Sequence, residues 1–154
     1  MSLTTPLYIF DLDGTLADQT HRRHFLDKND WDSYFDACPE DSPIQPVINI
    51  LYGLYWSGAE IWVFSGRSDR VKEQTLTWLD RYTCLSRNRF NDNQLVMRRA
   101  GDTRPDDVVK QEMLDNMLRY DRRRLVAVFD DRDRVVAMWR RNGIQCLQVA
   151  PGDF

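Results

Sequence analysis

The sequence predicts an α/β protein with an open parallel sheet of about five strands, helices on both faces, and a small helical insertion after the first strand. Two patterns carry this prediction: short, nearly continuous apolar runs typical of strands buried on both faces of a parallel sheet, and helical periodicity in the segments between them. Size agrees, because 154 residues with 42% hydrophobic residues suit one domain with a real core. We therefore expect residues 1–154 to form a single domain.

Five segments match the strand pattern, since each is short, apolar and rich in β-branched or aromatic residues. They are residues 7–12, 61–65, 94–98, 125–129 and 144–149. Helical patterns fill the gaps at residues 46–57, 69–82, 106–120 and 132–142. In the first of these helices, one face is expected to be buried because apolar residues recur at i, i+3, i+4 and i+7. These residues are Val47, Ile50, Leu51 and Leu54.

Residues 17–44 interrupt this alternation and are expected to form a small, mostly helical, cap-like insertion without strands, which ends at a turn in residues 39–43. We expect Trp31, Tyr34 and Phe35 to form a packing cluster, with a base-stacking platform as the alternative. His21 and His24 are three residues apart, but without a third ligand nearby they are expected on a helix surface rather than on a metal.

The charge balance excludes a general basic coat for nucleic acid, since 21 basic residues face 24 acidic ones and the net charge is −3. All basic residues except Lys28, Lys72 and Lys110 are arginines, which suits bidentate phosphate contacts, although a GC-rich genome gives the same bias. The three cysteines lack CxxC spacing and indicate a reducing cytoplasm. No apolar run reaches transmembrane length, so no membrane partner is expected.

Polar motifs follow three of the predicted strands. They are Asp11-Leu12-Asp13-Gly14-Thr15, Ser65-Gly66-Arg67 and Asp130-Asp131-Arg132. Because ligands of open α/β sheets bind beyond the carboxyl ends of the strands, we expect these side chains to meet at one edge of the sheet. Carboxylates gathered there repel one another unless a cation lies among them. A hard divalent ion with oxygen ligands, Mg²⁺, resolves this conflict.

The first motif resembles that of the haloacid dehalogenase superfamily of phosphotransferases, and Ser65, Lys110 and Asp130-Asp131 match its remaining motifs in order. The resemblance implies a Rossmann-like sheet of the haloacid dehalogenase type. It also implies that Asp11 is the nucleophile and takes the phosphoryl group as an aspartyl-phosphate. Asp13 would protonate the leaving oxygen and then activate the hydrolytic water, a role that favours phosphoryl transfer over dehalogenation.

The same resemblance implies a metal site and phosphate contacts. The Mg²⁺ ligands would be the carboxylates of Asp11 and Asp130, the main-chain carbonyl of Asp13, and Asp131 directly or through water. Ser65 and Lys110 would hold the remaining phosphoryl oxygens, and Gly14 would let the chain turn sharply beneath them. One carboxylate of the Asp130-Asp131 pair also suits the N-terminus of the helix that follows.

The second half resembles more closely the 3′-phosphatase domains of the bacteriophage polynucleotide kinase family. The likeness rests on residues 63–67, 101–110, 130–132 and 148–154, and covers roughly residues 60–154 plus the first motif. It implies functional roles for Arg67 and Asp106, and for an insertion arginine that aligns best with Arg22. The expected catalytic residues are therefore Asp11, Asp13, Ser65, Arg67 and Lys110. The expected substrate-binding residues are Gly14, Thr15, Arg22, Gly66, Asp106 and Arg132.

We therefore expect a Mg²⁺-dependent phosphomonoesterase that removes 3′-phosphates from nucleic-acid ends or nucleotides. The alternatives are a 5′- or 3′-nucleotidase acting on free mononucleotides, and a non-catalytic module that binds phosphorylated ends. The chain contains no GxxxxGK[ST] phosphate loop, so the resemblance extends to the phosphatase alone, and a separate kinase or ligase is the expected protein partner. The insertion does not align with the phage enzyme, which leaves DNA, RNA and mononucleotides open as substrates.

Overall fold

The sheet of this protein is parallel throughout and has the strand order β5-β4-β1-β6-β7. The computed structural model describes residues 4–86 and 94–154. The strands are β1 (Leu7–Phe10), β4 (Glu60–Ser68), β5 (Leu95–Arg98), β6 (Leu125–Asp130) and β7 (Cys146–Gln148). β1 is central, since its Phe10 pairs with Val63 of β4 on one side and with Phe129 of β6 on the other. The predicted five-strand parallel sheet is confirmed.

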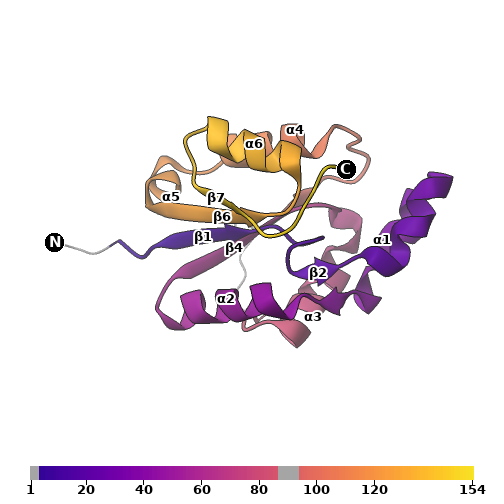
Figure 1. Ribbon diagram of the computed structural model, residues 1–154, viewed down its shortest axis with the longest axis horizontal. Helices are drawn as coiled ribbons and strands as arrows, with labels where there is room; N and C mark the ends of the chain where they lie inside the picture. Colours follow the sequence, from indigo (N-terminus) through magenta and orange to yellow (C-terminus); the bar gives the residue numbers. More distant parts are fainter. Residues whose placement is uncertain (1–3, 87–93) are drawn as a thin grey trace.

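Helices cover both faces of the sheet (Figure 1). They are α2 (Gln45–Trp56) and α3 (Lys72–Tyr82) on one face, and α4 (Asp106–Asp115) and α6 (Asp133–Arg141) on the other. Alternate strand residues therefore enter two apolar clusters, with Phe10 packed on the α2–α3 side and Ile9 on the α4–α6 side. Ile50, expected on the buried face of α2, is 46% exposed, and Ile48 is buried instead. Within the described residues, no helix combines the length and the apolarity needed to cross a membrane.

The helix predicted over residues 106–120 is wrong at its C-terminal end. α4 stops at Asp115, Leu118 is extended at φ −60° and ψ 145°, and a short helix α5 (Arg119–Arg124) follows. The break buries Met117 in the α4–α6 cluster and brings Arg124 Nη1 to 2.6 Å from Glu60 Oε2, which leaves the Arg124 side chain only 7% exposed. Neither glycine nor proline marks this turn, so helical periodicity alone could not reveal it.

The insertion contains two short strands that the sequence analysis missed. β2 (Ala17–Asp18) and β3 (Ser42–Pro43) pair in an antiparallel manner and are too short to show an alternating pattern. The rest is helical, as predicted. It comprises the 3₁₀ helices η1 (Thr20–Lys28) and η2 (Cys38–Glu40) and the helix α1 (Trp31–Asp36). The pairing ties the two ends of the insertion together, so that α1 stands beyond the carboxyl end of β1 (Figure 1).

Candidate active site

The loops that follow β1, β4 and β6 meet around one pocket of about 580 Å³ at the carboxyl edge of the sheet. The predicted residues that line it are Asp11, Asp13, Gly66, Arg67, Asp106, Lys110, Asp130, Asp131 and Arg132. Gly14, Thr15, Arg22 and Ser65 lie behind this lining and contact it directly, as described below. The structure therefore gathers all of the predicted site residues in one place.

Asp11, Asp130 and Asp131 form a cluster of buried carboxylates, with one oxygen of each within 4.8 Å of the others. Lys110 Nζ lies 2.6 Å from Asp11 Oδ1 and 2.7 Å from Asp130 Oδ2. Burial raises the pKa of Asp11 well above its ordinary value; the Lys110 charge opposes this shift, and the neighbouring carboxylates add to it. Burial and repulsion by Asp130 raise the pKa of Asp131 to about 6. One ammonium group is thus too little positive charge for three carboxylates.

This donor set fits a hard divalent cation. All three groups offer carboxylate oxygens, which Mg²⁺ prefers, and a cation between them removes the repulsion that disfavours their ionised forms. The carboxylate of Asp13 lies outside the cluster, so the ligand expected from this residue is its main-chain carbonyl. The residues present therefore fit a divalent metal ion.

The turn after β1 brings the backbone against Asp131. Gly14 has φ +87°, and a Cβ at this position would lie 2.2 Å from Asp131 Oδ2, so both the backbone conformation and the space require glycine. The Leu12 carbonyl closes the turn by accepting hydrogen bonds from the N–H groups of residues 15–17. Leu12 is therefore part of the turn, and β1 ends at Phe10 rather than at residue 12. Within the turn, Thr15 Oγ1 donates to Asp11 Oδ2 at 3.1 Å.

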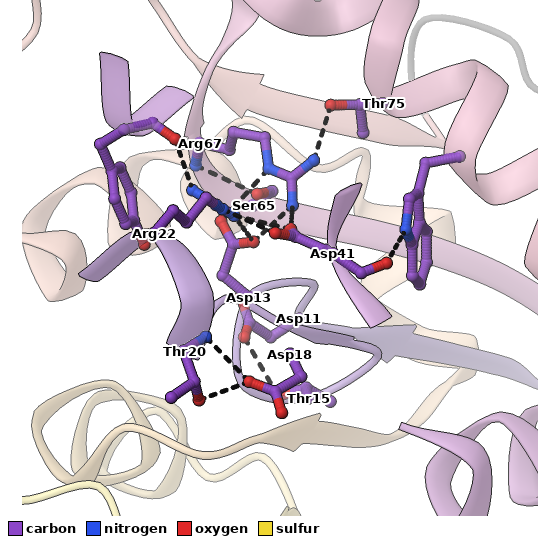
Figure 2. Close-up of polar contacts among 12 residues, drawn as sticks. Asp11, Asp13, Thr15, Asp18, Thr20, Arg22, Asp41, Ser65, Arg67 and Thr75 are labelled. Atoms are coloured by element: carbon purple, nitrogen blue, oxygen red, sulfur yellow. Dashed lines mark hydrogen bonds and ion pairs between the residues drawn. The ribbon is translucent and has the colours of Figure 1, made fainter. Parts of the chain in front are cut away.

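The Asp13 carboxylate lies between the guanidinium groups of Arg22 and Arg67 (Figure 2). Arg22 donates to Asp13 Oδ1 at 2.6 Å, and Arg67 donates to both carboxylate oxygens, through Nη2 and, at 3.3 Å, through Nε. Burial alone would raise the pKa of Asp13, but the two arginine charges outweigh it and lower the pKa. Ser65, fully buried beside them, accepts a hydrogen bond from the Arg67 N–H at 3.1 Å.

Asp41, which the sequence analysis missed, ties the two arginines together. Its carboxylate accepts two hydrogen bonds from Arg22, at 2.7 and 2.8 Å, and one from Arg67 at 2.9 Å. Its carbonyl accepts from Trp78 Nε1 at 2.8 Å, and the side chain is buried (Figure 2). The only sequence signal was its place in the turn at residues 39–43, where a connecting role was expected.

Asp106 opens α4 and anchors the opposite rim of the pocket. It forms ion pairs with Arg98 of β5 and with Arg132, which follows β6. A Cβ on Gly66 would lie 2.7 Å from Asp106 Oδ1, so glycine lets the chain pass close to this carboxylate. Arg132 also donates to the Phe154 carbonyl at 2.8 Å.

The insertion contributes a further wall. Trp31, Tyr34 and Phe35 form the predicted ring cluster, with ring centroids 5.4–6.0 Å apart, but all three also line the pocket. His21, expected on a helix surface, keeps a 40% exposed side chain but also lies 2.9 Å from Asp41 Oδ1. His24 Nδ1 is 3.0 Å from the His21 carbonyl.

Comparison with known proteins identifies the family. A family model described as the polynucleotide kinase PNKP phosphatase domain matches residues 5–154. The chain belongs to this family. It is a phosphatase of the haloacid dehalogenase type, and the resemblance seen in its motifs is confirmed.

The chain spans less than half the length of the two relatives that share 30% of its residues. A protein of Autographa californica nuclear polyhedrosis virus, described as a bifunctional polynucleotide kinase/RNA ligase, is 30% identical over 130 residues, which are 84% of this chain and 17% of the viral protein. A chain in the structure of the Pnkp1/Rnl/Hen1 RNA repair complex superimposes with a TM-score of 0.78 at 30% identity, covering 97% of this chain and 44% of that one. The class C acid phosphatase of Bacillus anthracis shares the fold, with a TM-score of 0.65 at 17% identity over 99% of this chain and 68% of its own.

Proposed function

We propose that this PNKP-type phosphatase removes the 3′-phosphate of a nucleic-acid end through an aspartyl-phosphate on Asp11, with Mg²⁺ as cofactor. The observation that supports it most is the presence, in one pocket, of a carboxylate cluster around Asp11 and an arginine pair around Asp13. The carboxylate cluster suits a residue that accepts the phosphoryl group beside a metal ion. The arginine pair suits the binding of an anionic phosphate beside an acid–base group.

The reaction proceeds in two displacements at phosphorus. A carboxylate oxygen of Asp11 bonds to the phosphorus while the bond to the sugar 3′-oxygen breaks, and the leaving oxygen takes a proton from Asp13. Water then attacks the phosphorus of the aspartyl-phosphate, and Asp13 takes up a proton from that water. The bond to Asp11 breaks, which releases inorganic phosphate and returns Asp11 to its ionised form and Asp13 to its protonated form.

Arg22 and Arg67 bind the phosphate and also release Asp13. In the free protein both guanidinium groups are engaged by Asp13 and Asp41. A phosphate dianion competes for the same hydrogen bonds, which weakens the hold on Asp13 and lets it carry the proton that the first displacement needs.

The remaining groups neutralise charge. Lys110 Nζ, 2.6 Å from Asp11, and the buried Ser65 hydroxyl hold phosphoryl oxygens at the reacting centre. Asp11, Asp130 and Asp131 would hold Mg²⁺, whose charge would offset the repulsion between an anionic nucleophile and an anionic ester. Asp106 fixes Arg98 and Arg132 at the rim, where the next backbone phosphate would pass.

We infer that the physiological substrate is an RNA end, and that a kinase and a ligase are the partners. The two relatives at 30% identity are described by RNA ligation and RNA repair. The present sequence has no GxxxxGK[ST] motif, so phosphorylation of the 5′ end must come from outside these 154 residues.

One oligonucleotide carrying either a 3′- or a 5′-phosphate tests the proposal, beside the 3′- and 5′-mononucleotides. We expect the highest kcat/KM for the 3′-phosphorylated oligonucleotide, with a KM that rises with salt. Salt weakens binding because, on single strands, each backbone phosphate contacted adds about −0.7 to the slope of the logarithm of the binding constant against the logarithm of the salt concentration. Fastest hydrolysis of free 5′-mononucleotides, without a salt effect, would replace this proposal by a nucleotidase.

A further inference from the structure

The insertion presents an aromatic wall to the catalytic pocket that the reaction at phosphorus does not use. We define this aromatic wall as Trp31, Tyr34 and Phe35, all on α1 and all lining the pocket that contains Asp11 and Asp13. Tyr34 is buried, whereas Trp31 is 51% exposed. Packing of the insertion alone does not require a tryptophan that lines the pocket with half of its surface exposed.

Contacts within the insertion hold the aromatic wall in place. The Trp31 ring lies 5.9 Å from that of Tyr34, edge to face, and 6.0 Å from that of Phe35. Trp31 Nε1 donates to Asn29 Oδ1 at 3.0 Å, and Asp30 caps the start of α1 through the Ser33 N–H, also at 3.0 Å. A ring held in this way loses little conformational entropy when a flat group stacks on it.

The aromatic wall is also joined to the phosphate-binding arginines. The guanidinium carbon of Arg22 lies 4.2 Å from the centre of the Tyr34 ring, and Arg22 Nη1 donates to the Tyr34 carbonyl at 3.1 Å. Arg22 in turn contacts Asp13. Arg22 and Tyr34 therefore link the acid–base carboxylate to Trp31, and the aromatic wall lines the same pocket as the group that carries the phosphate.

Cations complete the pocket. Arg99 and Arg134 line it, and neither has a carboxylate partner in the described part of the chain. Arg70 and Arg104 line it as well, but are paired with Asp36 at 2.9 Å and with Asp102 at 2.7 Å. A flat aromatic surface in the same pocket as arginines that have no carboxylate partner among the described residues matches a nucleobase followed by its backbone phosphate.

We propose that Trp31, supported by Tyr34 and Phe35, stacks the nucleobase of the 3′-terminal nucleotide while its 3′-phosphate lies against Asp11 and Arg67, which line the same pocket. The proposal rests on the proposed function and adds a binding subsite to it. Stacking on an indole tolerates every base, so the subsite selects nucleotides over base-free phosphomonoesters without reading sequence.

The test compares two 3′-phosphorylated oligonucleotides that are identical except that the terminal residue of one is a base-free tetrahydrofuran analogue. For the wild-type chain we expect kcat/KM to be about 5- to 150-fold higher with the base, the range that base–aromatic stacking gives. Trp31→Ala should bring this ratio close to one, and Trp31→Phe should restore most of it. Trp56→Ala is the matched control, because Trp56 is 75% exposed on α2 and does not line the pocket; it should keep the wild-type ratio.

A wild-type ratio near one, or an unchanged ratio in a folded Trp31→Ala variant, would overturn the stacking subsite. Failure of the proposed function looks different. If 3′- and 5′-phosphates are removed equally fast but the base preference persists and depends on Trp31, the subsite stands and the 3′-end assignment falls. If the 3′-phosphate is strongly preferred without any base preference, the 3′-end assignment stands and the stacking subsite falls.

Discussion

At the scale of single residues, the sequence predicted the groups that belong to linear motifs and missed one that does not. Asp11 and Asp130 stand at the ends of β1 and β6, which are neighbours in the sheet, so their convergence follows from the topology. Asp41 belongs to no such motif. Its partners Arg22 and Arg67 are 19 and 26 residues away and meet it only because β2 and β3 pair.

Asp41→Asn tests this network. The substitution keeps the shape but leaves two buried guanidinium groups with Asp13 as their remaining carboxylate, so we expect a loss of about 3 kcal/mol or more in the free energy of unfolding, with a raised KM for phosphate esters. Chemical denaturation and steady-state kinetics measure both effects. Asp36→Asn is the control, since its ion pair with Arg70 is exposed and is worth at most about 1 kcal/mol. Equal stability of the two variants would remove Asp41 from the account.

At the scale of elements, strands and helices were predictable where apolar periodicity was long and regular. The five parallel strands and the helices α2, α3, α4 and α6 appear where expected, with shifted ends. The break between α4 and α5 and the two-residue strands of the insertion were not predictable. Tertiary contacts set them, namely the burial of Met117 and the pairing of Ala17 with Pro43, and such contacts leave no local pattern.

The turn that carries Gly14 gives a prediction at this scale. Gly14→Ala must adopt φ +87° with its Cβ 2.2 Å from Asp131 Oδ2, so we expect a loss of about 2 kcal/mol or more together with displacement of Asp131 and weaker Mg²⁺ binding. Gly53→Ala is the matched control, because that helical glycine has nothing within 4 Å of an added Cβ. It should stabilise the protein by up to about 1 kcal/mol. Gly14→Ala that is as stable and active as Gly53→Ala would contradict the role of this turn.

At the scale of the whole molecule, the fold gathers charges of both signs into one pocket of a chain whose net charge is only −3. Carboxylates from β1 and β6 form the proposed metal site, and arginines from the insertion, β4 and β5 surround it. The pairing of Arg67 with Asp13 and of Arg132 with Asp106 could not be read from the sequence, because 54 and 26 positions separate the partners along the chain.

Metal addition is the prediction for the molecule as a whole. Binding to the folded state alone stabilises by about 2.7 kcal/mol at a Mg²⁺ concentration of 100 times Kd, which corresponds to a rise in Tm of roughly 5–10 °C for a protein of this size. Differential scanning calorimetry with and without chelator measures this rise. Asp131→Asn should reduce it strongly and Asp36→Asn should leave it unchanged. No rise in the wild-type chain at millimolar Mg²⁺ would contradict the metal site.

The central claim is that the phosphoryl group passes from a 3′ end to Asp11, and rapid acid quench with an oligonucleotide carrying a ³²P-labelled 3′-phosphate tests it most directly. We predict transient label on the wild-type protein and no label on Asp11→Asn, whose turnover should fall by at least about a thousandfold. Asp13→Asn should be labelled slowly but retain the label, because it lacks the base for the second displacement. Phosphate release by Asp11→Asn at a near-wild-type rate, or label on that variant, would contradict the account.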